Sequence, residues 1–76
     1  MAAQALLAAV GRAAENIGIH PRIGVSRPDL AGDRYRFVML SGFPYTLVYN
    51  AERDPPRIVR VLHGARDLPQ ALRHLR

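Results

Sequence analysis

The sequence predicts a small α+β domain, in which an N-terminal helix packs on a three-stranded antiparallel meander and a short helix follows. Residues 2–16 predict the first helix, because they are rich in alanine and leucine and repeat apolar side chains at helical spacing. Residues 34–63 predict the sheet, because three segments rich in β-branched and aromatic residues are joined by two short turns. The chain has 76 residues, so we expect one domain over residues 1–76.

The first element is the alanine-rich helix. Leu6, Val10, Ala13 and Ile17 recur at helical spacing and form one apolar stripe. Gly18 is expected to end the helix. The segment is as apolar as a secretory signal peptide, but no basic residue precedes its apolar part, so we interpret it as a helix of the folded domain.

A loop separates this helix from the sheet, because residues 18–33 contain Pro21, Gly24, Pro28 and Gly32, which interrupt regular structure. Three strands follow, and the short turns between them imply two successive hairpins. The strands are expected at residues 34–40, 45–50 and 57–63, with turns at 41–44 and 51–56.

The last element is a short helix over residues 68–76, which Asp67 caps and in which Pro69 occupies the first turn. Gly64 ends the strand before it. Arg66 and Asp67 lie in the connecting turn. We expect them to have a structural role, such as an ion pair that fixes this turn, rather than a catalytic role.

Strict alternation along the first strand separates its aromatic residues from its arginines. Tyr35 and Phe37 share one face, and we expect this face to pack on the N-terminal helix. Arg34 and Arg36 then point outward, and Arg60 in the third strand joins them. Because apolar residues share this outward face, it suits a partner that brings both carboxylates and apolar side chains. An alternative is that the arginines are only solvated, with their stems over apolar neighbours.

The third strand, RIVRVLH, carries two arginines and a histidine at its end. Alternation places Arg57 and His63 on one face and Arg60 on the other. A general acid or base needs a residue such as His63, but a lone histidine at a strand end is more often a hydrogen-bonded structural residue. We therefore interpret this segment as a core strand whose Arg60 faces a partner, not as an active site.

The basic residues are all arginine: 11 Lys and Arg in total, none of them lysine, against 6 acidic residues, which gives a net charge of +5. One explanation is a GC-rich genome that favours arginine codons. The other is affinity for an acidic partner, either protein or nucleic acid. Composition does not decide between them.

Several kinds of chemistry are excluded or unsupported. The chain has no cysteine, which excludes disulfides and thiolate metal sites. The three histidines have no metal-ligand spacing, and there is no phosphate loop, dinucleotide fingerprint or serine nucleophile motif. No apolar run approaches the roughly 20 residues that span a bilayer. We therefore expect no cofactor, no metal and no membrane partner.

Residues 43–67, FPYTLVYNAERDPPRIVRVLHGARD, resemble the C-terminal half of the ParE branch of the RelE/ParE toxin superfamily. The shared features are the Phe-Pro-Tyr strand start, the tyrosine at the strand end, and Arg-Val-Leu-His-Gly-x-Arg-Asp, which closes the last strand. The upstream loop HPRIGVSRPDLAGDRYR is similar to the family's loop into its second strand. The similarity runs from about residue 13 to residue 67.

The resemblance implies a strand, a helical hairpin and an antiparallel meander. This sequence lacks the counterparts of the first strand and the first helix, so we expect a truncated version of that fold. The missing elements would leave an exposed sheet edge and an uncovered apolar face. The isolated chain is then expected to dimerise, exchange elements or depend on a partner.

The resemblance also implies a cytoplasmic toxin of a type II toxin–antitoxin pair. A ParE-like member poisons DNA gyrase without being an enzyme and is neutralised by a cognate antitoxin, ParD-like or similar. The expected binding residues for antitoxin or target are Arg34, Arg36, Arg60 and Arg66.

Two alternatives to this function stay open. One is a RelE-like mRNA interferase, a ribosome-dependent endoribonuclease, for which the resemblance offers Arg36, Arg60, His63 and Arg66, with His74 as another proton donor. The set contains no lysine, and no tyrosine follows Tyr49, so the non-nuclease function is favoured. The other alternative is a degenerate member without toxicity.

Overall fold

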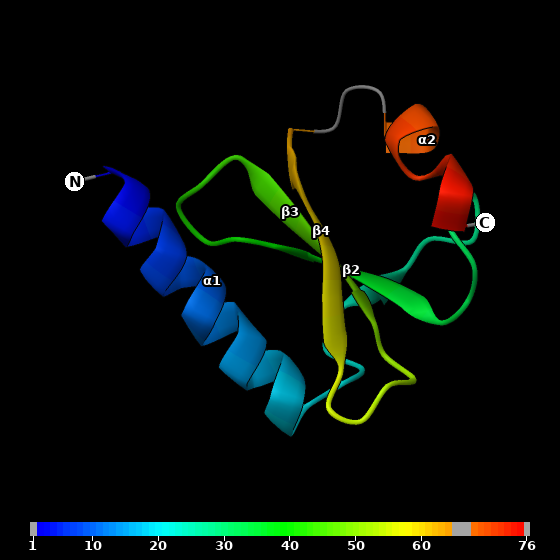
Figure 1. Ribbon diagram of the computed structural model, residues 1–76, viewed down its shortest axis with the longest axis horizontal. Coiled ribbons are helices and arrows are strands. Elements are labelled where there is room, and N and C mark those ends of the chain that lie inside the picture. The colour runs from blue at the N-terminus through cyan, green and yellow to red at the C-terminus, as the bar shows by residue number, and fades with distance from the viewer. Residues whose placement is uncertain (1, 65–67, 76) are drawn as a thin grey trace.

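The computed structural model describes residues 2–64 and 68–75, and its architecture is α+β, as the sequence predicts (Figure 1). A long helix is followed by an antiparallel sheet and a short C-terminal helical segment. The sheet contains the three expected strands and one additional two-residue strand from the preceding loop. The elements are α1 (Ala2–Ile19), β1 (Val25–Ser26), β2 (Tyr35–Met39), β3 (Tyr45–Asn50), β4 (Arg57–His63), α2 (Leu68–Ala71) and the 3₁₀ turn η1 (Arg73–Leu75).

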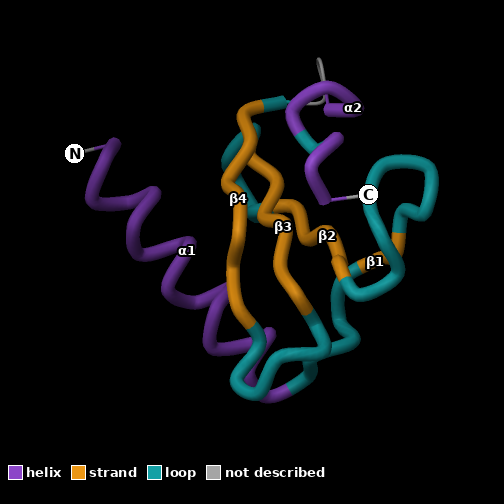
Figure 2. The backbone as a smooth tube through the Cα atoms, turned by 45° about the vertical axis from the view of Figure 1, so that its right-hand side comes forward, coloured by secondary structure: helices purple, strands orange, loops and turns teal. Residues whose placement is uncertain are grey.

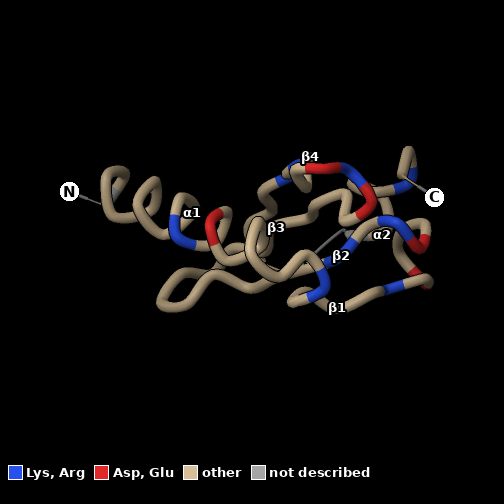
Figure 3. The backbone as a smooth tube through the Cα atoms, turned by 90° about the horizontal axis from the view of Figure 1, so that it is seen from below, with Lys and Arg blue, Asp and Glu red and all other residues tan. Residues whose placement is uncertain are grey.

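Helix α1 follows the predicted apolar stripe but ends later than expected. Ile17 is buried, and Leu6, Val10 and Ala13 pack against its cluster. Gly18 does not end the helix, which continues to Ile19. Helix α1 lies at one side of the sheet (Figures 1, 2 and 3), and only one side of the helix is covered, since Ala9 and Ile17 are buried whereas Leu7 and Ile19 are exposed.

Gly11 lies inside α1 with free space around it, because an added Cβ would meet no atom within 4 Å. Replacing Gly11 with alanine is expected to raise the free energy of unfolding by about 0.5–1 kcal/mol, since alanine loses less backbone entropy in a helix. Gly42 is the matched control, because it also has open space but a φ of 81° that disfavours alanine. Thermal unfolding followed by circular dichroism measures both changes, and we expect opposite signs. A stabilised Gly42→Ala variant would contradict this account.

The four strands form one antiparallel sheet in the order β1-β2-β3-β4. Strand β1 pairs with β2 only through Val25↔Phe37 and Ser26↔Arg36, so much of the β2 edge is left without a strand partner. Strand β4 forms the other edge.

The two faces of the sheet are covered by opposite ends of the chain (Figure 2). Leu47, Tyr49 and Leu40 pack with Ile17 of α1, and we call this side the α1 face. The other side is covered by the loop residues Leu30 and Ala31 and by the C-terminal segment. We call it the C-terminal face, and its buried strand residues are Phe37 and Val48.

This arrangement corrects the predicted placement of the aromatic residues. Phe37 and Tyr35 do not pack on the N-terminal helix but belong to the cluster that contains Leu72. Val38 and Leu40 contact the α1 cluster instead. Both sides of β2 are apolar, so alternation alone does not identify the side that α1 covers.

A β-bulge in β4 corrects a second prediction. Val48 pairs with Arg60 and Tyr49 pairs with Ile58, so Val59 is an additional residue without a partner across the ladder. Directly paired residues lie on the same face. Because of the extra residue, Arg57, which pairs with Asn50, lies on the same face as Arg60 rather than opposite to it.

The loop before β1 is fixed by two side chains on the α1 face. The Tyr49 hydroxyl accepts a hydrogen bond from the Gly24 N–H at 2.9 Å and donates one to the Pro21 carbonyl at 2.6 Å. Arg36 donates to the Gly24 carbonyl at 2.7 Å. Gly24 has no room for a side chain, because a Cβ would lie 2.9 Å from the Phe37 oxygen and from the Tyr49 ring. The loop therefore depends on a glycine at this position.

Candidate functional site

The candidate site is built on a row of side chains that crosses three strands on the C-terminal face. Tyr35 of β2 pairs with Asn50 of β3, and Asn50 pairs with Arg57 of β4. Arg60 lies on the same face as Arg57, because Val59 is the extra residue of the β-bulge between them. One end of the sheet therefore presents a phenol, an amide and two guanidinium groups together.

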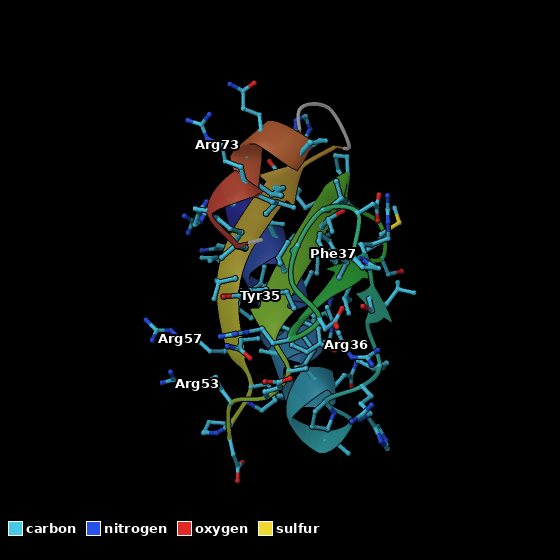
Figure 4. All side chains as sticks on the ribbon, turned by 90° about the vertical axis from the view of Figure 1, so that its right-hand side faces the viewer. Tyr35, Arg36, Phe37, Arg53, Arg57 and Arg73 are labelled. Carbon is cyan, nitrogen blue, oxygen red and sulfur yellow. The ribbon has the colours of Figure 1, made fainter. Side chains whose placement is uncertain are left out.

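The turn between β3 and β4 adds a third guanidinium group. Arg53 lines a hollow of about 330 Å³. Figure 4 shows Arg53 and Arg57 projecting side by side, away from the side on which Arg36 lies. Among residues 2–64 and 68–75, no acidic side chain lines this hollow. Its lining residues are Tyr35, Asn50, Arg53, Arg57, Ile58, Val59 and Arg60.

A second hollow, of about 450 Å³, adjoins the first and shares Tyr35 with it. Its lining is mixed in charge: Gly32, Asp33, Arg34, Tyr35, Glu52, His74 and Leu75. We call the two adjoining hollows the basic trough. The C-terminal segment forms one wall because the Gly32 N–H donates to the Leu75 carbonyl at 2.9 Å, which holds η1 beside the loop.

Arg60 and His74 meet at the edge of the basic trough. Nη2 of Arg60 lies 2.6 Å from Nε2 of His74. A guanidinium group only donates hydrogen bonds, so the imidazole nitrogen accepts. Nη1 of Arg60 also donates to the Val59 carbonyl at 2.8 Å. Two contacts thus fix the orientation of an exposed arginine.

The other arginines of the basic trough form no ion pair with a carboxylate of the described residues. Arg53 and Arg57 form no ion pair with any of the residues that the structure describes, although Glu52 is close in sequence to both. Arg34 lies over the Tyr35 ring, 6.0 Å from its centroid. These guanidinium groups are therefore available for an anionic ligand.

Arg27 differs from the arginines of the basic trough because it has an acidic partner. Its Nη2 lies 2.9 Å from an Asp29 oxygen. The hydrogen bond to Asp29, followed by the attraction between the two charges, raises the pKa of Arg27 above its usual value. Arg27 is thus neutralised locally.

The structure separates the arginines that the sequence placed together. Arg36 pairs with Tyr49 on the α1 face, where its guanidinium group bonds to the loop backbone. Arg60 lies on the opposite face, with Val48. The prediction that Arg36 and Arg60 share an outward face is therefore wrong. Arg34 precedes β2 and is exposed beside Tyr35.

Two further predictions concern the end of β4. His63 lies on the α1 face, with its ring centroid 5.0 Å from that of Tyr45, so it does not meet Arg60. Arg66 and Asp67, with their expected ion pair and helix cap, lie outside the described residues. The nuclease set of Arg36, Arg60, His63 and Arg66 is therefore not assembled by the residues that the structure describes.

Sequence reasoning missed Arg53 and Arg57 as members of the site. No sequence motif marks these two residues, and strict alternation places Arg57 on the wrong face. A metal is not supported either, since residues 2–64 and 68–75 contain no cluster of three or more candidate ligands. In the same part of the chain, no helix has the length and apolar character needed to cross a bilayer.

One comparison with known proteins agrees with the resemblance seen in the motifs. A family model described as "ParE toxin of type II toxin-antitoxin system, parDE" matches residues 2–68. The chain belongs to the ParE toxin family. No curated protein and no solved structure matches it. As a ParE-family member, it is the toxin component of a type II toxin–antitoxin system, whose toxins work with an antitoxin partner.

Proposed function

We propose that this ParE-family toxin acts in the cytoplasm by binding and inhibiting DNA gyrase, without cutting RNA. The observation that supports a binding function is the separation of the candidate nuclease residues. Arg36 and His63 lie on the α1 face, and Arg60 lies on the C-terminal face. General acid–base catalysis needs its groups within hydrogen-bond reach of one substrate. A binding protein needs only an exposed complementary surface.

A cognate, ParD-like antitoxin is proposed to neutralise the toxin by wrapping around it. Apolar and cationic surfaces lie on different sides of the chain. A hollow of about 220 Å³ between α1 and the β2 edge is lined by Ile17, Ile23, Val38 and Met39, among others. The arginines of the basic trough lie on the C-terminal face. A segment with both apolar and acidic residues would contact both surfaces.

The proposed binding residues differ in how exposed their side chains are and in the hydrogen bonds that they already make. Arg34 and Arg60 are exposed and remain candidates for contact with antitoxin or gyrase. Arg36 is half-buried and donates to the Gly24 carbonyl, so its proposed contribution is to hold the loop that borders the contact surface. Arg66 is retained as a proposed contact from its position after β4.

One observation favours the RNA-cutting alternative. Arg60 and His74 are 2.6 Å apart at the edge of the basic trough, where a guanidinium group and an imidazole could act on one phosphodiester. Under this alternative, His74 would move the proton and Arg60 would stabilise negative charge.

A two-reaction assay with purified components tests the proposal. We expect the toxin to inhibit gyrase supercoiling while mRNA on translating ribosomes stays intact, and the cognate antitoxin to reverse the inhibition. His74→Gln should leave gyrase inhibition within about twofold of the original, because glutamine keeps a hydrogen-bond acceptor for Arg60 but cannot transfer a proton. Cleaved mRNA that becomes intact with His74→Gln would instead establish the nuclease. Failure of both activities would indicate a degenerate, non-toxic member.

A further inference from the structure

The basic trough differs in character from the other hollows on the molecule. The hollow beside α1 is lined mainly by aliphatic side chains such as Ile17 and Val38. Another, of about 420 Å³, is bordered by Val25, Phe37 and Met39. The hollow around Arg57 presents guanidinium, amide and phenol groups instead. An amphipathic peptide needs apolar pockets for its side chains, and this hollow offers few of them.

The three guanidinium groups of this hollow come from three backbone positions that the fold brings together. Arg53 is in the β3–β4 turn, Arg57 begins β4, and Arg60 follows the bulge. All three are exposed, and no acidic side chain in the described part of the chain lines the hollow that they surround. Guanidinium groups donate paired hydrogen bonds to phosphate oxygens, so the arrangement suits several phosphates along one chain better than a single carboxylate.

Tyr35 lies at the junction of the two hollows that form the basic trough. The ring is half-buried, and Arg34 lies over it at 6.0 Å. Aromatic rings combined with arginines in a cationic groove are the pattern by which proteins hold single-stranded nucleic acid, through base stacking and phosphate contacts. Tyr35 cannot leave this position easily, since it packs against the core cluster of the C-terminal face.

We propose that the hollow around Arg57, which is the part of the basic trough without Asp33 and Glu52 in its lining, binds the phosphodiester backbone of a single-stranded nucleic acid, with Arg53, Arg57 and Arg60 on the phosphates and Tyr35 beside a base. The site is a binding site and requires no cleavage. It goes beyond the proposed function, which concerns protein partners. Because the same arginines are proposed to contact an acidic antitoxin segment, a nucleic-acid strand and the antitoxin would compete for this hollow. DNA and RNA share this backbone chemistry, so the experiment distinguishes them.

Fluorescence anisotropy with labelled 20-nucleotide strands tests the proposal. The purified chain is titrated into single-stranded DNA, single-stranded RNA of the same sequence, duplex DNA, and a polyglutamate peptide of similar charge. Arg53→Gln/Arg57→Gln is the test variant. Arg12→Gln/Arg22→Gln is the matched control, because it removes the same two charges from the net +5 at exposed positions outside the basic trough. Circular dichroism verifies that both variants are folded.

We expect the test variant to bind single strands about tenfold more weakly and the control variant to stay within about twofold. The slope of log affinity against log salt should become shallower by about 1.4 in the test variant only, since each lost phosphate contact on a single strand accounts for about 0.7. Stronger binding of DNA than RNA, or the reverse, identifies the natural strand. Equal losses in both variants, no binding of any strand, or preference for polyglutamate would overturn the proposal.

Discussion

Replacing Tyr49 with phenylalanine is expected to lower the free energy of unfolding by about 1–3 kcal/mol, although the ring itself is kept. Tyr49 is 0% exposed, and its hydroxyl bonds to the Gly24 N–H and the Pro21 carbonyl. Phenylalanine leaves both backbone groups without this partner, and Gly24 is buried. For a domain of this size, each kcal/mol corresponds to about 4–8 °C in Tm. Urea and thermal unfolding, followed by circular dichroism, measure the loss.

Tyr45→Phe is the matched control for this substitution. Tyr45 lies on the same strand and the same face, but its hydroxyl has no hydrogen bond to the described residues. We expect its removal to change stability by less than about 0.5 kcal/mol. If the two variants lost the same stability, the cause would be a general effect of the lost hydroxyl rather than the attachment of the 21–24 loop to the sheet.

Much of the fold follows from local patterns in the sequence. The helix is encoded by the spacing of Leu6, Val10, Ala13 and Ile17, and all four face the core as expected. The strand bounds at 45–50 and 57–63 agree with the structure, because turn-forming residues flank both segments. The two-residue β1 was not predicted, since a glycine- and proline-rich loop gives no strand signal.

The choice of face could not be made from the alternation of β2. Phe37 and Leu40 point to opposite sides, and both are buried. A helix covers one side only, so the decision depends on what covers the other side. That cover is supplied by Leu30, Ala31 and Leu72, which are distant from β2 in the sequence or separated from it by a turn. The alternation of residues within β2 therefore does not predict which residues cover its second face.

The sequence predicts two of the arginines that line the basic trough, Arg34 and Arg60, but not Arg53 or Arg57. A cationic surface for an acidic partner was expected, and Arg34 and Arg60 are exposed as that requires. A strict period of two throughout β4 places Arg57 on the face opposite to Arg60. A bulge shifts that period by one residue, and nothing in the RIVR sequence marks it. Arg36 lies on the α1 face because it alternates with Phe37, which packs on the C-terminal face instead of on the helix.

Replacing Leu72 with alanine is expected to have the largest effect on stability, about 2–5 kcal/mol. Leu72 lies between α2 and η1, is 0% exposed, and belongs to the cluster with Phe37 and Val48. Alanine would leave a cavity at the point where the C-terminal segment meets the sheet. Small domains have only about 5–15 kcal/mol of stability in total, so a substantial part of it would be lost.

Leu7→Ala is the control for Leu72→Ala, because it removes the same atoms from a side chain that is 70% exposed. We expect it to change stability by less than about 0.5 kcal/mol in urea unfolding. Equal effects would mean that the C-terminal segment does not cover the sheet. The consequence extends to the basic trough, since Leu72 anchors the segment that places His74 2.6 Å from Arg60. A single buried leucine thus stabilises the core and holds one wall of the candidate site in place.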